Sequence, residues 1–223
     1  MTLFRHPRHW ALWDVVFPPI CSLCSRPLGN ALLFCPTCWA AAPLVENEQL
    51  PDLKYVDMAR AGYRFGGDDV VRAAVHALKY ERLRLVARDM AGCLVSCLPL
   101  RFVESDEQWT SVPLHWARRM NRGFNQSLLL ATELAALVQH EGPNRLLTRI
   151  RNTPTQTSLT RRERARNLKG AFRITVPKPL PKAVLLIDDV ITTGATMDEC
   201  AFTLKSAGVE WVGALAFALS VHR

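Results

Sequence analysis

The sequence predicts an α/β fold, in which helices cover both faces of a parallel β-sheet. Strand-like and helix-like segments alternate along the 223 residues, and this order is typical of parallel sheets. The run Val184–Ile187 is apolar at four successive positions, as expected of a strand that is buried on both faces. The segment after it has one apolar helical face, and Gly208 fits the end of that helix. This face consists of Met197, Cys200, Ala201 and Leu204.

The other elements follow from their own patterns. A strand-compatible segment at 55–65 ends at Gly66, and a second strand at 109–112 leads into Pro113. Helices are expected at 70–78 and 83–98, and a third helix has Leu128, Ala131, Leu134, Ala135 and Val138 on its apolar side. A final strand is expected near 211–219. Residues 154–167 show no period and are expected to form a long mobile loop.

Two carboxylates, Asp188 and Asp189, stand where the strand at 183–187 is expected to end. A turn of small residues follows them, and Thr196 is expected to cap the next helix. The amide N–H groups of such a turn favour a phosphate. The carboxylates need sugar hydroxyls or a divalent cation as partners, and a ribose phosphate offers both an anion and hydroxyls. The alternative is a strand that ends in a structural Asp turn with a Thr cap.

Four of the seven cysteines form two C-x2-C pairs that are separated by ten residues. Two such pairs can close a tetrahedral site, so we expect Cys21, Cys24, Cys35 and Cys38 to hold a structural Zn²⁺. The competing interpretation is two disulfides, which an odd number of cysteines and the lack of a secretory pattern disfavour. Cys93, Cys97 and Cys200 lie among apolar residues and are expected to pack as small hydrophobic side chains.

The formal net charge is +8, and much of it is concentrated in one segment. Between Arg145 and Arg173 there are nine Lys or Arg residues and a single acid, Glu163. Such a segment suits an anionic ligand, and both pyrophosphate and a nucleic-acid backbone fit this description. No apolar run approaches the length of a membrane span, so we expect a cytoplasmic protein.

Three stretches resemble a known family. Residues 187–196 (IDDVITTGAT) resemble the phosphoribosyl pyrophosphate signature of type I phosphoribosyltransferases. Residues 112–126 (VPLHWARRMNRGFNQ) and the segment from Thr153 to Phe172 resemble the ComF/GntX branch of that superfamily. The amino-terminal cysteine pairs complete the ComF layout. The resemblance spans the chain from Phe17 to Phe217.

The resemblance implies a type I phosphoribosyltransferase fold, a parallel sheet flanked by helices, with a small N-terminal zinc ribbon. The expected divisions are an amphipathic segment at 1–17, a four-cysteine zinc ribbon at 18–45 and a linker at 46–56. A phosphoribosyltransferase-like domain is expected at 57–223.

The resemblance also implies roles for individual residues. Asp188 and Asp189 would accept hydrogen bonds from the ribose hydroxyls and stabilise positive charge that develops on the ring. Arg118, Arg119 and Arg122 would contact the pyrophosphate, which binds with Mg²⁺, and the loop that carries Arg161 and Arg162 would fold over the site. The ribose phosphate would be held by Val190, Ile191, Thr192, Thr193, Gly194, Ala195 and Thr196.

ComF-like proteins are associated with natural transformation and the use of external DNA, which implies a role with single-stranded DNA. The first hypothesis is therefore a DNA-uptake factor that binds phosphoribosyl pyrophosphate, with the Arg-rich segment on the DNA. Trp116 and Phe124 are the aromatic residues near that segment that could stack on bases. The second is an active phosphoribosyltransferase with an unidentified nitrogen acceptor. The third is a zinc-ribbon adaptor for a competence helicase or channel protein. The first is favoured because little sequence remains for an acceptor pocket, whereas cations are dense.

Overall fold

The computed structural model describes residues 19–28, 33–46, 50–67, 69–80, 84–103, 107–114, 123–151, 166–177 and 179–220. The expected amphipathic segment at 1–17 lies outside the described residues, and so do Arg118, Arg119, Arg122, Arg161 and Arg162. No helix in the described part of the chain combines the length and the apolar character that a membrane crossing requires.

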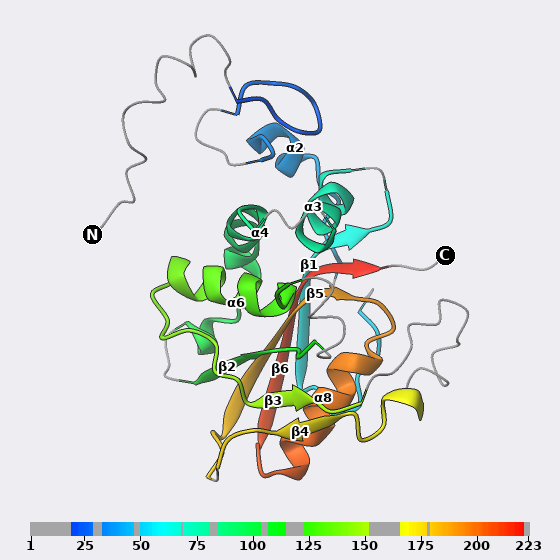
Figure 1. Cartoon of the computed structure of the whole chain (residues 1–223), viewed down its shortest axis with the longest axis vertical. Helices are drawn as coiled ribbons and strands as arrows, with labels where there is room; N and C mark the ends of the chain where they lie inside the picture. Colours follow the sequence, from blue (N-terminus) through cyan, green and yellow to red (C-terminus); the bar gives the residue numbers. More distant parts are fainter. Residues whose placement is uncertain are drawn as a thin grey trace.

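A four-stranded parallel sheet forms the centre of the molecule (Figure 1). Its strands lie in the order β1 (Met58–Phe65), β6 (Trp211–Ser220), β5 (Ala183–Ile191) and β2 (Gln108–Ser111). Nearly every residue of β5 and β6 is buried, as the continuous apolar run predicts for central parallel strands. The predicted α/β class, with a mainly parallel sheet flanked by helices, is confirmed.

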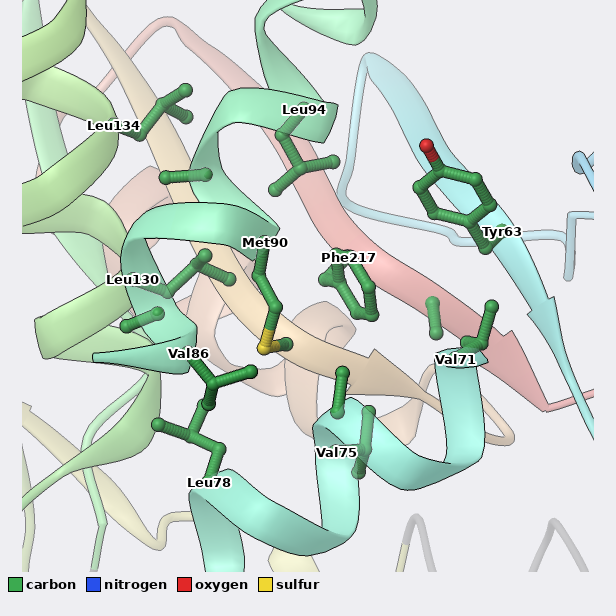
Figure 2. Close-up of a cluster of buried hydrophobic side chains, with 14 of the residues drawn as sticks. Tyr63, Val71, Val75, Leu78, Val86, Met90, Leu94, Leu130, Leu134 and Phe217 are labelled. Carbon is green, nitrogen blue, oxygen red and sulfur yellow. The ribbon is translucent and has the colours of Figure 1, made fainter. Parts of the chain in front are cut away.

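Helices cover both faces of the sheet. On one face lie α3 (Val70–Lys79), α4 (Val86–Leu94) and α6 (Gln126–Leu137), which share one apolar cluster with the sheet (Figure 2). Two short 3₁₀ turns, η2 (Val95–Cys97) and η3 (Leu100–Phe102), follow α4. Burial of each Leu or Met side chain in this cluster stabilises the folded state by roughly 1.5–3 kcal/mol. The apolar side of α6 differs from the prediction, because Leu130 is buried where Leu128 was expected.

The other face is covered by α8 (Ala195–Ser206) and by a hairpin that the sequence patterns do not predict. The hairpin pairs β3 (Leu147–Arg149) with β4 (Phe172–Ile174) in antiparallel register. Most of the segment expected to be a mobile loop lies between these two strands and outside the described residues. Each strand has only three residues, which is too short for alternation to show.

The two ends of α8 differ in how well the sequence predicts them. At the C-terminus, Gly208 has φ +113°, and the amides of Gly208 and Val209 donate to the carbonyls of Lys205 and Leu204. This is the predicted glycine stop in the Schellman arrangement. At the N-terminus the capping residue is Gly194, with φ +77°. The predicted Thr196 cap is therefore wrong, because the helix already begins at Ala195.

The predicted end of the central strand is also wrong. Strand β5 continues through both aspartates to Ile191, because β6 pairs with it as far as the Ile191–Leu219 contact. The turn before α8 is correspondingly short and consists of the three residues at 192–194.

The cysteine module packs on the main core. Its helix α2 (Pro36–Ala40) places the Trp39 ring 6.0 Å from Tyr63 and 5.9 Å from Phe217, measured between ring centroids. The chain then runs beside β1, where the Val45 amide donates to the Gly62 carbonyl at 3.1 Å. Residues in the expected linker range contact α8, since the Tyr55 amide donates to Asp198 Oδ1 at 2.7 Å.

Candidate functional site

The four N-terminal cysteines come together in one cluster. Their sulfur atoms all lie within 4.8 Å of one another, with Sγ–Sγ distances of 3.8 Å for Cys21 and Cys38 and 3.5 Å for Cys24 and Cys35. A tetrahedral Zn²⁺ with Zn–S bonds of about 2.3 Å requires sulfur atoms about 3.8 Å apart. The cluster could therefore hold a zinc ion without a large rearrangement, and it is compatible with the predicted zinc ribbon.

The electrostatics of the cluster fit a cation. Burial opposes ionisation of Cys21, but the amides of Cys35, Cys24 and Leu23 outweigh it and lower its pKa to about 6. Burial, followed by the neighbouring sulfur atoms, raises the pKa of Cys38 to about 12. Cys38 therefore ionises easily only beside a compensating positive charge. A zinc ion supplies that charge, because it binds thiolates rather than thiols.

The acidic pair lies at the carboxyl end of β5, where parallel α/β sheets bind their ligands. Asp188 Oδ1 accepts hydrogen bonds from Ser127 Oγ at 2.6 Å and from the Asp189 amide at 2.9 Å. Asp189 is only 8% exposed, and its Oδ2 forms an ion pair with Lys79 Nζ. Both carboxylates are thus already engaged by side chains of the helices at this edge.

Asp188 and Asp189 also influence each other. Burial, and then the adjacent charge of Asp189, raises the pKa of Asp188 to about 8, against the opposing effects of Ser127 and Lys79. The pair therefore tends to retain a proton at neutral pH. A bound cation, or hydroxyl groups that donate to the carboxylates, would favour the fully ionised pair.

The turn between β5 and α8 leads into a helix N-terminus, where the Ala195 amide donates to Thr193 Oγ1 at 3.5 Å. The N–H groups of Ala195, Thr196 and Met197 have no acceptor within the helix, because they belong to its first turn. Thr192 is exposed, and Thr193 and Thr196 are partly exposed, whereas Ile191 is buried and Val190 partly buried in β5. The predicted phosphate-binding range is therefore split: its first two residues belong to the sheet and the rest form the turn and the helix start.

The left-handed residue Gly194 is covered by another part of the chain. A Cβ atom at this position would overlap Cδ2 of Leu53 and lie 3.1 Å from Cγ of Pro51. Residues just before β1 therefore lie against the turn, and only glycine allows that approach.

Sequence reasoning missed Lys79 and Ser127. Lys79 is the last residue of α3, and Ser127 lies two positions after Asn125, whose side chain caps α6. Neither belongs to the signature motif, and their chain positions give no sign that both reach the acidic pair. Only the packing of α3 and α6 on the same edge of the sheet brings them there.

Comparison with known proteins identifies relatives over most of the chain, although no family model matches it. The DNA utilization protein YhgH of Salmonella typhimurium LT2 is 32% identical over 201 residues, which cover 86% of this chain and 87% of that protein. YhgH of Escherichia coli K12 is 33% identical over 198 residues and 85% of each chain. Competence protein F of Haemophilus influenzae is 41% identical over 101 residues, 44% of each chain. Competence protein ComFC of Streptococcus pneumoniae is 30% identical over 149 residues, 66% of this chain and 56% of that one.

The chain belongs to the ComF family. The family resemblance that the signature motifs predict is thereby confirmed. The cysteine cluster and the carboxyl edge of the sheet each bring together chemistry-bearing side chains from separate segments of the chain.

Proposed function

We propose that this ComF-family protein acts in DNA utilization or natural competence and binds phosphoribosyl pyrophosphate at the carboxyl edge of its sheet. The names of its relatives, which refer to DNA utilization and competence, support the first part. The geometry at 188–197 supports the second: two aspartates, a left-handed glycine and a helix N-terminus lie next to one another in the chain.

In this proposal the two halves of the ligand meet different groups. The 5′-phosphate binds the amides of the first turn of α8 and the hydroxyls of Thr193 and Thr196, where the helix dipole favours an anion. The ribose hydroxyls donate to Asp188 and Asp189. Ser127 holds the Asp188 carboxylate in place, and Lys79 forms an ion pair with Asp189.

Mg²⁺ is proposed to accompany the pyrophosphate group. Two neighbouring carboxylates, one with a raised pKa, form an oxygen-rich donor set that suits this hard cation. The carboxylates of Asp188 and Asp189 would hold the ion, which would supply positive charge beside the pyrophosphate.

An active phosphoribosyltransferase is the second candidate function. The observation that favours it is the position of two carboxylates where the ribose would bind, since negative charge there stabilises the positive charge that develops on the ring. Release of pyrophosphate on mixing the protein and phosphoribosyl pyrophosphate with bases, amines and DNA fragments would establish this activity.

Single-stranded DNA is the proposed macromolecular partner. The described cations of the Arg-rich segment are mostly exposed, including Arg145, Arg151, Arg166, Lys169 and Arg173. Such a cluster binds nucleic-acid phosphates with a steep dependence on salt. A competence helicase or channel protein is a further proposed partner, through the zinc ribbon, where Ile20 is 53% and Leu23 is 44% exposed.

Titration calorimetry with phosphoribosyl pyrophosphate and Mg²⁺ tests the central part of the proposal. We expect a binding heat that disappears when Asp188→Asn and Asp189→Asn are combined. Glu141→Gln, an exposed acid remote from the pair in sequence, is the matched control and should bind normally. Equal binding heats for the unchanged protein, the double variant and Glu141→Gln would refute the proposed binding of the sugar phosphate by the two aspartates.

A further inference from the structure

A second concave site lies beside α6, apart from the acidic pair. It is a cavity of about 660 Å³ between α6, the chain that leaves β2 and the β3–β4 hairpin. In Figure 1, β2 lies between α6 and this hairpin. The aspartates and the turn before α8 are not among its described lining residues. The volume falls within the roughly 300–1,000 Å³ of typical small-molecule sites.

One wall of the cavity offers a stacking surface. The guanidinium carbon of Arg84 lies 4.9 Å from the ring centroid of Phe124, and both residues line the cavity. Phe124 is partly buried and packs against the apolar cluster beneath α3, α4 and α6. Arg84 is exposed, so the outer face of its guanidinium group remains accessible to a flat ligand. Nucleobases stack on both aromatic rings and guanidinium planes.

The opposite wall offers a permanent positive charge and hydroxyl groups. Arg145 is exposed and precedes β3, while Thr148 and Thr175 come from the two sides of the hairpin. The Thr175 hydroxyl donates to the Arg145 carbonyl, which ties the backbone at this position to β4. None of the described lining residues has a carboxylate. This wall therefore favours an anion, and a guanidinium group suits phosphate oxygens in particular.

We propose that the cavity binds one nucleotide unit, with its base on the Arg84–Phe124 stack and its phosphate on Arg145. A flat aromatic group and an anion are the two features that the walls select, and a nucleotide carries both. The unit can come from a free nucleotide or from single-stranded DNA, because the recognised chemistry is the same. This inference rests on the proposed partnership with single-stranded DNA and locates one part of it. It uses none of the contacts proposed for Asp188, Asp189 and the turn before α8, although the cavity is lined by residues on both sides of the segment that carries Arg118, Arg119 and Arg122.

Fluorescence anisotropy with the full-length protein tests the site, using a labelled 12-nucleotide oligothymidylate and, as competitor, deoxythymidine monophosphate. Phe124→Leu keeps an apolar side chain for packing but removes the ring on which Arg84 lies. We expect the oligonucleotide to bind about 10-fold more weakly, because the loss of one stacking contact is of this size. Phe124→Tyr should restore binding. Arg145→Ala should reduce the slope of log affinity against log salt by about 0.7, the effect of one single-strand phosphate contact.

Two exposed arginines that do not line the cavity, Arg88 on α4 and Arg173 on β4, provide matched controls. Arg88→Ala should leave the Arg84–Phe124 stack intact and should not weaken oligonucleotide binding as Phe124→Leu does. Arg173→Ala should lower the affinity for the oligonucleotide less than Arg145→Ala does. Ultraviolet crosslinking of the oligonucleotide should label the peptide that contains Phe124, which a purely structural role of the ring would not produce. Competition by the mononucleotide would identify free nucleotides as ligands, and binding of the oligonucleotide alone would identify the strand.

The proposal is overturned if Phe124→Leu and Arg145→Ala, both folded by circular dichroism, bind the oligonucleotide and the mononucleotide as the unchanged protein does. Phosphoribosyl pyrophosphate calorimetry on the same variants separates the two proposals. Arg145→Ala should leave that heat unchanged, because Arg145 lies outside the acidic pair, the turn before α8 and the segment at 112–126.

Discussion

Substitution of Gly194 by Ala tests the closest approach in the candidate site. Gly194 has φ +77°, and a left-handed conformation costs an L-residue roughly 1–2 kcal/mol. The added Cβ would also overlap Leu53 Cδ2 and lie in tight contact with Pro51, 3.1 Å from its Cγ. Overpacking of this kind costs about 1–3 kcal/mol. The free energy of unfolding should therefore fall by about 2–5 kcal/mol.

Gly170 provides a matched control for the backbone contribution. It also has a left-handed backbone, with φ +68°, but a Cβ there would meet nothing within 4 Å. Gly170→Ala should therefore cost only the roughly 1–2 kcal/mol of backbone strain. Urea denaturation followed by circular dichroism measures both variants, and the difference between them isolates the contact with residues 51–53.

A double-mutant cycle with Leu53→Ala completes the test, because removing the Leu53 side chain removes the overlap. Gly194→Ala should then cost about 1–3 kcal/mol less than it does in the unchanged protein. If Gly194→Ala costs the same in both backgrounds, and no more than Gly170→Ala, residues 51–53 do not lie on this turn and the account of the site is wrong.

Three further predictions concern the metal cluster and the acidic pair. Metal analysis should find one zinc per chain, and removal of the zinc by a chelator should lower the thermal unfolding midpoint in scanning calorimetry. A metal-free protein with an unchanged midpoint would contradict the zinc ribbon. Because burial and the charge of Asp189 raise the pKa of Asp188 to about 8, the folded state retains a proton that the unfolded state releases above about pH 4. The contribution of Asp188 to stability therefore falls as pH rises toward 8, so Asp188→Asn should gain stability relative to the unchanged protein between about pH 5 and 8 in urea titrations. If the free energy of unfolding changes with pH in the same way for both proteins, the raised pKa of Asp188 is refuted. Ser127→Ala removes a hydrogen bond to Asp188 and should lower the free energy of unfolding by roughly 1–3 kcal/mol. Ser127→Thr keeps a hydroxyl and should retain most of the stability of the unchanged protein. Equal losses of stability in the two variants would show that the hydroxyl is not the cause.

The sequence predicts those parts of the fold that local patterns encode. The run at 184–187 gives the central strand, the spacing of Met197, Cys200 and Leu204 gives the buried side of α8, and Gly208 gives its end. The two C-x2-C pairs likewise predict the cysteine cluster, because ligand spacing is a local property.

The features that the sequence did not predict depend on contacts between distant segments. Strand β5 extends past the aspartates because β6 offers it a partner, and α8 starts at Ala195 because Gly194 adopts the left-handed conformation under Leu53. Lys79 reaches Asp189 across more than a hundred residues of chain. Polar residues at a strand end favour a turn locally, and the pairing of β5 with β6 outweighs that preference.

The structure of this protein with phosphoribosyl pyrophosphate and Mg²⁺ tests the central claim most directly. We expect the 5′-phosphate on the amides at 194–197 and the ribose hydroxyls within hydrogen-bonding distance of Asp188 and Asp189. A ligand seated elsewhere, with the two carboxylates making no contact with it, would contradict the account.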